Sequence, residues 1–143
     1  MKLTEIINII DVVAGMQPFV NQVIENDIYR LNSLTNVKYG VFGFQQRQHQ
    51  MESDGEFWRY TFQFFVLDRL TQDGGNEIEL QSTAIEVLDN IIKTLVDVFD
   101  GDLEIYGDVV YQPFTQQFKD ETAGAYCTIT FRLPADCLCP EIF

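Results

Sequence analysis

The 143-residue sequence is poor in the side chains on which most enzymes and metal proteins depend. It has three cysteines and one histidine, and nine Lys and Arg against 22 Asp and Glu leave a net charge of −13. Three cysteines do not build a disulfide framework. Cys127 falls in a strand-like alternation, where we expect a small buried side chain. Cys137 and Cys139 form a C-x-C pair that would need two further ligands to hold zinc, and His49 lies far away in the sequence. We therefore predict no metal and no cofactor.

Motifs for catalysis are also missing from the sequence. It contains no G-x-S-x-G, no H-E-x-x-H, no phosphate-binding glycine loop and no Rossmann fingerprint. His49 stands among glutamines, where we expect a surface loop residue, because a general base needs burial and a positioned partner. The acidic cluster from Asp97 to Glu104 lacks the spacing and central glycine of an EF-hand, and we interpret it as a solvated helix end. We predict that the protein is not an enzyme.

Long apolar runs and basic residues are scarce as well. No run of 18 or more apolar residues occurs, so we expect no membrane span. Glu5 and Asp11 interrupt the apolar stripe near the N-terminus, which we interpret as a helix of the mature fold and not as a signal peptide. The shortage of Lys and Arg argues against nucleic-acid binding, which needs basic groups to displace counterions from phosphates. The acidic surplus is compatible with simple solubility, with a DNA mimic, or with a channel wall that DNA passes without sticking.

The periodic patterns that are present indicate an α+β fold. The helical period predicts helices near 3–13, 19–31 and 79–99, and alternation predicts strands near 37–45, 56–68, 103–111 and 125–133. The order ααββαββ predicts an antiparallel four-stranded sheet with helices packed on one face. We expect one domain over 1–143, with N-terminal helices in 3–31, a sheet-and-helix core in 37–134 and a C-terminal tail in 135–143.

The strand at 56–68 is apolar on both faces. One face would carry Trp58, Tyr60, Phe62 and Phe64, and the other also carries aromatic and aliphatic residues. Each such side chain contributes about 1.5–3 kcal/mol when it is buried. We therefore expect helices to cover one face and a partner subunit to cover the other, with polar loops at 45–56 and 112–124 as further contact material.

Three stretches of the sequence resemble a known family. They are SLTNVKYGVFGF, WRYTFQFFVLDRL and PFTQQFKDETAGAYCTITFRLP, with a long amphipathic helix between the last two. Together they resemble small structural proteins of tailed bacteriophages, and more narrowly the tail-terminator or tail-completion type at the neck, including those of crAss-like phages of Bacteroides-type hosts. The resemblance covers about residues 30–140. The matching positions are Val66, Leu67, Asp68 and Arg69 at a strand end, and Pro113, Phe114, Thr115, Phe118, Asp120, Ala123, Gly124 and Tyr126 in a link.

This resemblance implies a virion protein, made in the host cytoplasm, that forms a homo-oligomeric ring of sixfold or twelvefold symmetry in the neck or upper tail. The ring would join or seal the head-side connector to the tail. Its partners would be copies of itself and neighbouring neck, portal-side and tail proteins, while DNA passes through the lumen without sequence-specific binding and no membrane is involved. The link at 116–122 would be a contact arm whose removal leaves the monomer folded but abolishes the ring. The expected interface residues are Trp58, Tyr60, Phe62, Phe64, Phe114, Phe118, Asp120, Glu121, Leu138 and Phe143.

Two other functions fit parts of the sequence. An acidic inhibitor that mimics DNA would need carboxylates spaced like phosphates on one exposed face, whereas the acidic residues here are scattered through turns and helix ends. A small-ligand-binding or enzymatic α+β domain would need an aromatic pocket, which Trp58, Tyr60, Phe62 and Phe64 would build. A pocket of this kind would contain converging polar groups, whereas an interface would be flat and open.

Overall fold

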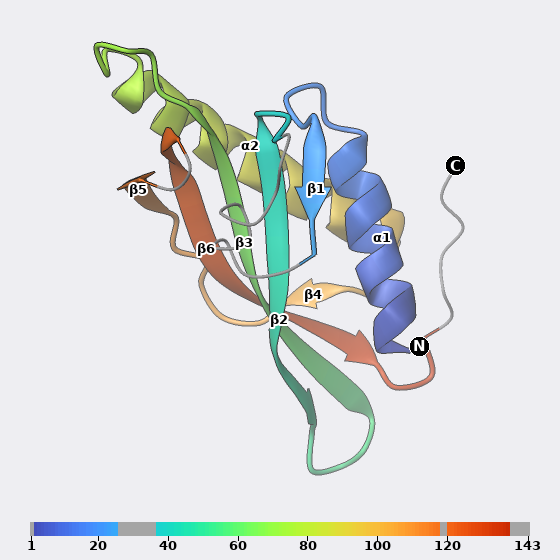
Figure 1. The fold of residues 1–143 in the computed structure, drawn as a ribbon. Helices are drawn as coiled ribbons and strands as arrows, with labels where there is room; N and C mark the ends of the chain where they lie inside the picture. The colour runs from blue at the N-terminus through green and yellow to red at the C-terminus, as the bar shows by residue number, and fades with distance from the viewer. Residues whose placement is uncertain (1, 26–36, 118–119, 138–143) are drawn as a thin grey trace.

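Two helices and six strands form in residues 2–25, 37–117 and 120–137, the parts of the chain that the computed structural model describes (Figure 1). Their order is α1 (Leu3–Gly15), β1 (Gln22–Ile24), β2 (Val41–Met51), β3 (Phe57–Arg69), α2 (Glu77–Val98), β4 (Glu104–Ile105), β5 (Gln112–Gln117) and β6 (Glu121–Pro134). Over these ranges no helix is long and apolar enough to cross a bilayer.

All six strands belong to one mixed sheet. Its central order is β1-β2-β3-β6, and β4 and β5 both pair with the outer edge of β6. β1 runs parallel to β2, and the other pairs are antiparallel. The expectation of a four-stranded antiparallel sheet in the order ααββαββ is therefore wrong. The chain instead follows the order αβββαβββ, with six strands and one parallel pair.

The expected second helix accounts for part of this error. The residues 20–24 fit both a helical and a strand pattern, and they lie beside the segment that leads into β2. The Asn21 N–H donates to the Gly40 carbonyl over 2.8 Å, and the Gln22 side chain accepts the Lys38 N–H over 2.7 Å. These long-range hydrogen bonds favour a strand, because a helix at the same residues would not make them. Residues 26–31 of the expected helix lie outside the described part of the chain.

The main core lies between the sheet and the two helices. Even-numbered residues of β3 point into it, as do the buried stripes of α1 and α2, so that both helices pack on the same face. The Phe42 and Phe64 rings meet edge to face with their centroids 5.3 Å apart. Phe62 and Phe64 are fully buried beside Phe131 of β6. This packing of aromatic rings holds the helices on the three long strands.

A second, smaller core covers one end of the opposite face. Phe65 and Leu67 of β3 are buried there, with Val41 and Ile24 beside them. The partly buried side chains that pack over them come from 37–39 and from β5. The chain itself therefore supplies the cover that the sequence pattern led us to expect from a partner subunit.

Candidate functional site

The β2–β3 hairpin extends past the helices and forms an arm, which we define as residues 47–59. Figure 1 shows its tip projecting beyond the N-terminal end of α1. A β-bulge between Gln46 and Gln48 marks the beginning of the arm in β2, and bulges of this kind bend and twist a strand. Residues 47–51 of β2 and 53–56 of the turn are exposed. The arm thus presents side chains to solvent on both sides of the hairpin.

His49 lies on the helix side of the arm, within β2 and not in the loop that we expected. Its ring stacks on Tyr60 at a centroid distance of 4.4 Å and contacts Trp58 at 4.6 Å. Desolvation by these rings lowers the pKa of His49. The neutral imidazole is therefore the form that the folded arm favours.

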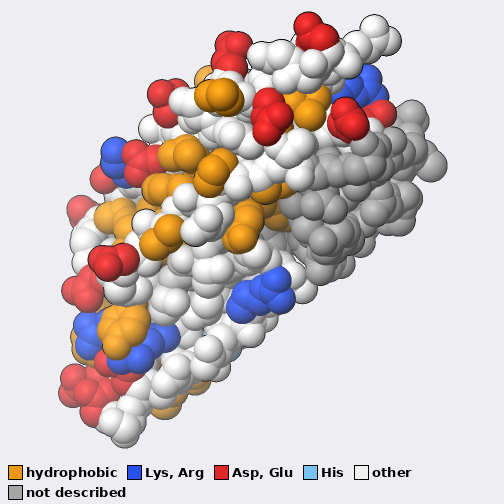
Figure 2. Space-filling model, turned by 90° about the vertical axis from the view of Figure 1, so that its left-hand side faces the viewer, with side chains coloured by type: hydrophobic (Ala, Val, Ile, Leu, Met, Phe, Trp, Pro, Cys, Tyr) orange, Lys and Arg blue, Asp and Glu red, His pale blue; other side chains and the backbone are white. Residues whose placement is uncertain are grey.

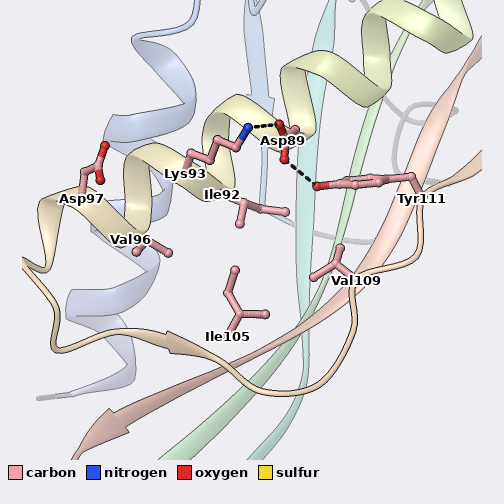
Figure 3. A pocket seen from close by; sticks show the side chains of 8 residues that line it. All are labelled: Asp89, Ile92, Lys93, Val96, Asp97, Ile105, Val109 and Tyr111. Atoms are coloured by element: carbon pink, nitrogen blue, oxygen red, sulfur yellow. Dashed lines mark hydrogen bonds and ion pairs between the residues drawn. The ribbon is translucent and has the colours of Figure 1, made fainter.

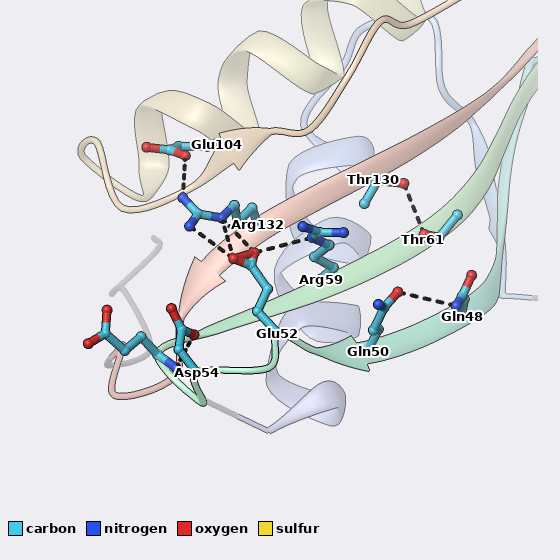
Figure 4. Close-up of polar contacts among 10 residues, drawn as sticks. Gln48, Gln50, Glu52, Asp54, Arg59, Thr61, Glu104, Thr130 and Arg132 are labelled. Atoms are coloured by element: carbon cyan, nitrogen blue, oxygen red, sulfur yellow. Dashed lines mark hydrogen bonds and ion pairs between the residues drawn. The ribbon is translucent and has the colours of Figure 1, made fainter.

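An ion-pair cluster lies next to the turn of the arm on the helix-free side (Figure 4). Arg132 of β6 donates to Glu52 over 2.9 Å and to Glu104 of β4 over 3.1 Å, and Arg59 of β3 reaches the same Glu52 over 3.2 Å. The hydrogen bond from Arg132, helped by Arg59, lowers the pKa of the Glu52 carboxyl. The two guanidinium groups also lie over aromatic rings, Arg132 at 3.5 Å from the centre of Phe57 and Arg59 at 3.9 Å from the centre of Tyr106. The cluster joins β4 and β6 to the β2–β3 hairpin.

The rest of the helix-free face is a row of amides and hydroxyls. Arg47 donates to the Gln63 side chain, and the hydroxyls of Thr61 and Thr130 share a hydrogen bond of 2.9 Å. Gln48 and Gln50 stand beside one another on the arm (Figure 4). This surface is hydrophilic and is built on the middle strands of the sheet.

The predicted contact loop at 116–122 is mostly strand. Gln116 pairs with Thr122 across the β5–β6 hairpin, and Thr122, with no exposed surface, also pairs with Arg69 of β3. Asp120 accepts a hydrogen bond of 2.7 Å from the Tyr39 hydroxyl and pairs with Arg69 at 3.0 Å. Burial, reinforced by Asp120, raises the pKa of Tyr39 to about 12. The segment is part of the sheet, so its removal would cost the fold strand pairs as well as any contact with a neighbour.

The predicted interface residues fall into three groups. Tyr60, Phe62 and Phe64 are buried in the main core, and Trp58 is half-buried against it, so these rings offer little or no surface to another chain. The same packing fills the space in which an aromatic ligand pocket was expected. Near the sheet edge, Phe114 is half-buried in the smaller core, Asp120 is ion-paired and Glu121 is exposed. The remaining three, Phe118, Leu138 and Phe143, lie outside the described residues.

Two of the three cysteines lie in the described part of the chain, and both are buried. Burial raises the pKa of the Cys127 thiol to about 12, which leaves it an inert core group. Cys137 is buried with its Sγ 3.8 Å from Oδ2 of Asp102, and Cys139 lies outside the described residues. Within the described ranges, no group of three or more His, Cys, Asp and Glu side chains is arranged to hold a metal ion.

A second surface feature, which the sequence did not indicate, is a groove of about 570 Å³ between α2 and the segment 105–111 (Figure 3). Its apolar lining comes from Ile92, Val96, Ile105 and Val109, and its polar rim from Asp89, Lys93, Asp97 and Tyr111.

The polar end of this groove is held by a short hydrogen-bonded chain. The Tyr111 hydroxyl donates to Asp89 over 3.3 Å, and Lys93 pairs with the other oxygen of Asp89 over 2.6 Å (Figure 3). Burial, reinforced by Asp89, raises the pKa of Tyr111 to about 12. Tyr111 is therefore neutral and acts as a donor at neutral pH, which fixes the end of the segment 105–111 against α2.

Neither the protein-family models nor the curated proteins that were searched contain a match to this chain.

Proposed function

We propose that the protein is a structural virion protein of a tailed bacteriophage that assembles with copies of itself into a ring in the neck or upper tail. The ring joins or seals the head-side connector to the tail. The proposal rests on the resemblance of the sequence to tail-terminator and tail-completion proteins, and the observation that carries it is the projecting arm.

The arm is longer than the fold of the monomer requires. β2, β3 and β6 have 11, 13 and 14 residues, whereas strands in globular proteins have about 5–6. At about 3.3 Å per residue, β3 alone spans roughly 40 Å. The far end of the hairpin lies beyond the helices and contributes exposed polar side chains, so it adds little to the monomer's core. A rigid, hydrophilic projection of this kind is well suited to contact a neighbouring subunit.

Charge distinguishes one position on the arm. The arm is acidic like the rest of the chain, with Arg47 and Arg59 against Glu52, Asp54 and Glu56, but Arg59 is paired with Glu52, whereas Arg47 is an exposed cation. In a ring of identical subunits the contacts are heterologous, so that one surface meets a different surface of the next copy. The exposed Arg47 fits an acidic surface elsewhere on the same chain. The remaining acidic surplus would make the lumen repel DNA, which favours its free passage.

The acidic-inhibitor alternative receives no such support. A DNA mimic needs carboxylates spaced like phosphates on one exposed face, whereas the acidic residues are spread over turns, helices and strands, and Glu52, Asp89 and Asp120 are engaged in ion pairs with cations of the same chain. Glu104 also pairs with Arg132.

The oligomeric state of the purified chain tests the ring. Light scattering after size-exclusion chromatography, together with native mass spectrometry, would be run at about 0.05 M and about 0.5 M salt, because screening weakens the repulsion between subunits of like charge. We expect a closed oligomer of six or twelve copies that is more populated at high salt.

Two charge reversals make the test specific. Arg47→Glu on the arm is expected to dissociate the oligomer without changing the melting temperature. Lys38→Glu, an equal charge change at another exposed residue away from the arm, is the matched control and is expected to leave the oligomer intact. A wild-type chain that stays monomeric at both salt concentrations, or equal dissociation by both variants, would contradict the proposal.

A further inference from the structure

We propose that the groove between α2 and the segment 105–111 binds an apolar segment of a different protein in which the apolar residues are flanked by lysine or arginine. The inference does not depend on the ring. Within the proposed function, the partner would belong to a neighbouring layer of the neck or tail.

The groove exists because the outer edge of β6 is only partly paired. Along β6, the pairing with β5 ends at Tyr126, which lies opposite Gln112. The pairing with β4 begins at Phe131, which lies opposite Ile105. Tyr106 still donates its N–H to the Thr130 carbonyl over 2.8 Å, and after it the chain from Gly107 to Tyr111 leaves the sheet and bows outward, with Gly107 at a φ of 80°. Neither β4 nor β5 covers this stretch of β6, and the space between the bowed segment and α2 stays open as the groove.

Apolar surface is concentrated at this place. Ile105 of β4 is 38% exposed, and it lines the groove together with Val109 of the bowed segment. Ile92 and Val96 of α2 continue the apolar lining from the opposite wall. Figure 2 views this side of the molecule and shows hydrophobic side chains at several places across the face, with Asp and Glu side chains and a few Lys and Arg side chains around them. A contiguous apolar surface with a polar rim is typical of a protein-binding site.

The charge at the rim determines which occupant fits. Asp89 and Lys93 line the groove but cancel one another in their 2.6 Å ion pair. The acidic charge that remains at the rim comes from Asp97 of α2 and from the exposed Asp108 of the bowed segment. A second copy of this chain, which itself carries −13, would on average bring acidic surface to an acidic rim. A segment with basic residues on both sides of an apolar centre meets the groove with complementary charge.

Three synthetic peptides separate the contribution of the apolar centre from that of the basic flanks. The probe is fluorescein-labelled KKLVILKK, which has an apolar centre and basic flanks. EELVILEE keeps the apolar centre and reverses the flanks, and KKSTQSKK keeps the flanks without the apolar centre. Fluorescence anisotropy with the full chain measures each affinity. We expect KKLVILKK to bind at least about tenfold more tightly than either control, since one unfavourable charge or one lost apolar contact changes affinity by about this factor.

Binding must also map to the groove. In amide NMR spectra of the wild-type chain, we expect the shifts induced by KKLVILKK to centre on Ile92, Val96, Ile105 and Val109. Ile105→Thr, which keeps a β-branched residue in β4, should weaken binding several-fold, whereas Ile78→Thr, at an 80% exposed isoleucine outside the groove, should not. Asp97→Asn should weaken binding about threefold, and Glu79→Gln on the same helix should leave it unchanged.

Equal affinity for KKLVILKK and KKSTQSKK would show general attraction to an acidic protein and would overturn the proposal. The proposal would also be overturned by shifts centred on the arm. It would be overturned as well if no binding were detected at about 1 mM peptide, because an affinity weaker than this is too weak for a specific site. The experiment measures peptide binding to a single chain, so a negative result would not contradict the proposed ring. Conversely, a chain that stays monomeric could still be tested for peptide binding.

Discussion

The two faces of β3 use the same strand for different purposes. On the helix face, Tyr60, Phe62 and Phe64 are buried and pack with rings from β2 and β6. On the other face, Arg59, Thr61 and Gln63 are partly exposed and form hydrogen bonds and ion pairs. The comparison teaches that one face holds the monomer together, whereas the other stays hydrophilic over most of its length and is free to meet another molecule.

The largest expected effect comes from the helix face. Phe62→Ala would leave a cavity in the main core and should lower the free energy of unfolding by about 3–5 kcal/mol. Gln63→Ala, the neighbouring residue on the opposite face, should change it by less than about 0.5 kcal/mol. Urea denaturation of both variants measures the contrast. Equal losses would mean that the helix-free face also carries the stability of the monomer.

The covered end of the helix-free face should show the next largest effect. A Cβ at Gly124 would lie 1.9 Å from the carbonyl oxygen of Val66, which is backbone of the central strand and has little room to move. Gly124→Ala should therefore cost about 1–3 kcal/mol or more. Gly15→Ala is the control, because a Cβ there meets no atom within 4 Å and alanine favours the helix. Similar stability of both variants in urea would show that β3 and β6 are packed less closely than described.

The ion-pair cluster should affect motion locally and not global stability. Glu52→Gln removes the charge that both Arg59 and Arg132 face. We expect faster amide hydrogen exchange at the arm and unchanged exchange in the buried half of β3. Asp54→Asn, at an exposed carboxyl in the neighbouring turn, is the control. Unchanged exchange in the Glu52 variant would mean that the strand pairing alone holds the arm.

The smallest expected effect is the pH dependence from His49. Its pKa is lowered in the fold, so the unfolded chain binds more protons as the pH falls below the ordinary value of 6.5. The contribution of His49 is therefore fully present above that pH and is lost as the pH falls through the lower pKa of the fold. Melting temperatures between about pH 7 and pH 5 should decline slightly less for His49→Gln than for the wild type. Parallel curves would show that the stacked ring titrates as it does in solution.

The elements that depend on local periodicity could be predicted from the sequence. The helix-face alternation of β3 and the apolar stripe of the long helix α2 were visible in the order of residues, because one residue in two or in three to four faces the core. The strand β1 and the division of the last segments into β4, β5 and β6 depend on hydrogen bonds between residues far apart in the chain. A short apolar run fits either a helix or a strand until those partners are known.

The candidate surfaces were predictable to a smaller extent. The sequence marked 45–56 as polar, but the ion pair that connects the arm to β6 joins Glu52 and Arg132, which are 80 residues apart. It assigned Tyr60, Phe62 and Phe64 to an interface because alternation does not say which face the chain will cover itself. The groove depends on where β4 and β5 stop pairing with β6, a matter of register that composition does not encode.

The most direct test of the proposed function is the number of copies of this chain in purified phage particles whose genome encodes it. Quantitative mass spectrometry with isotope-labelled peptides would compare it with the major capsid subunit. The ring predicts a fixed, low stoichiometry of six or twelve copies per particle, and the value would decide between the two symmetries. Complete absence from the particles would contradict a structural role in the virion.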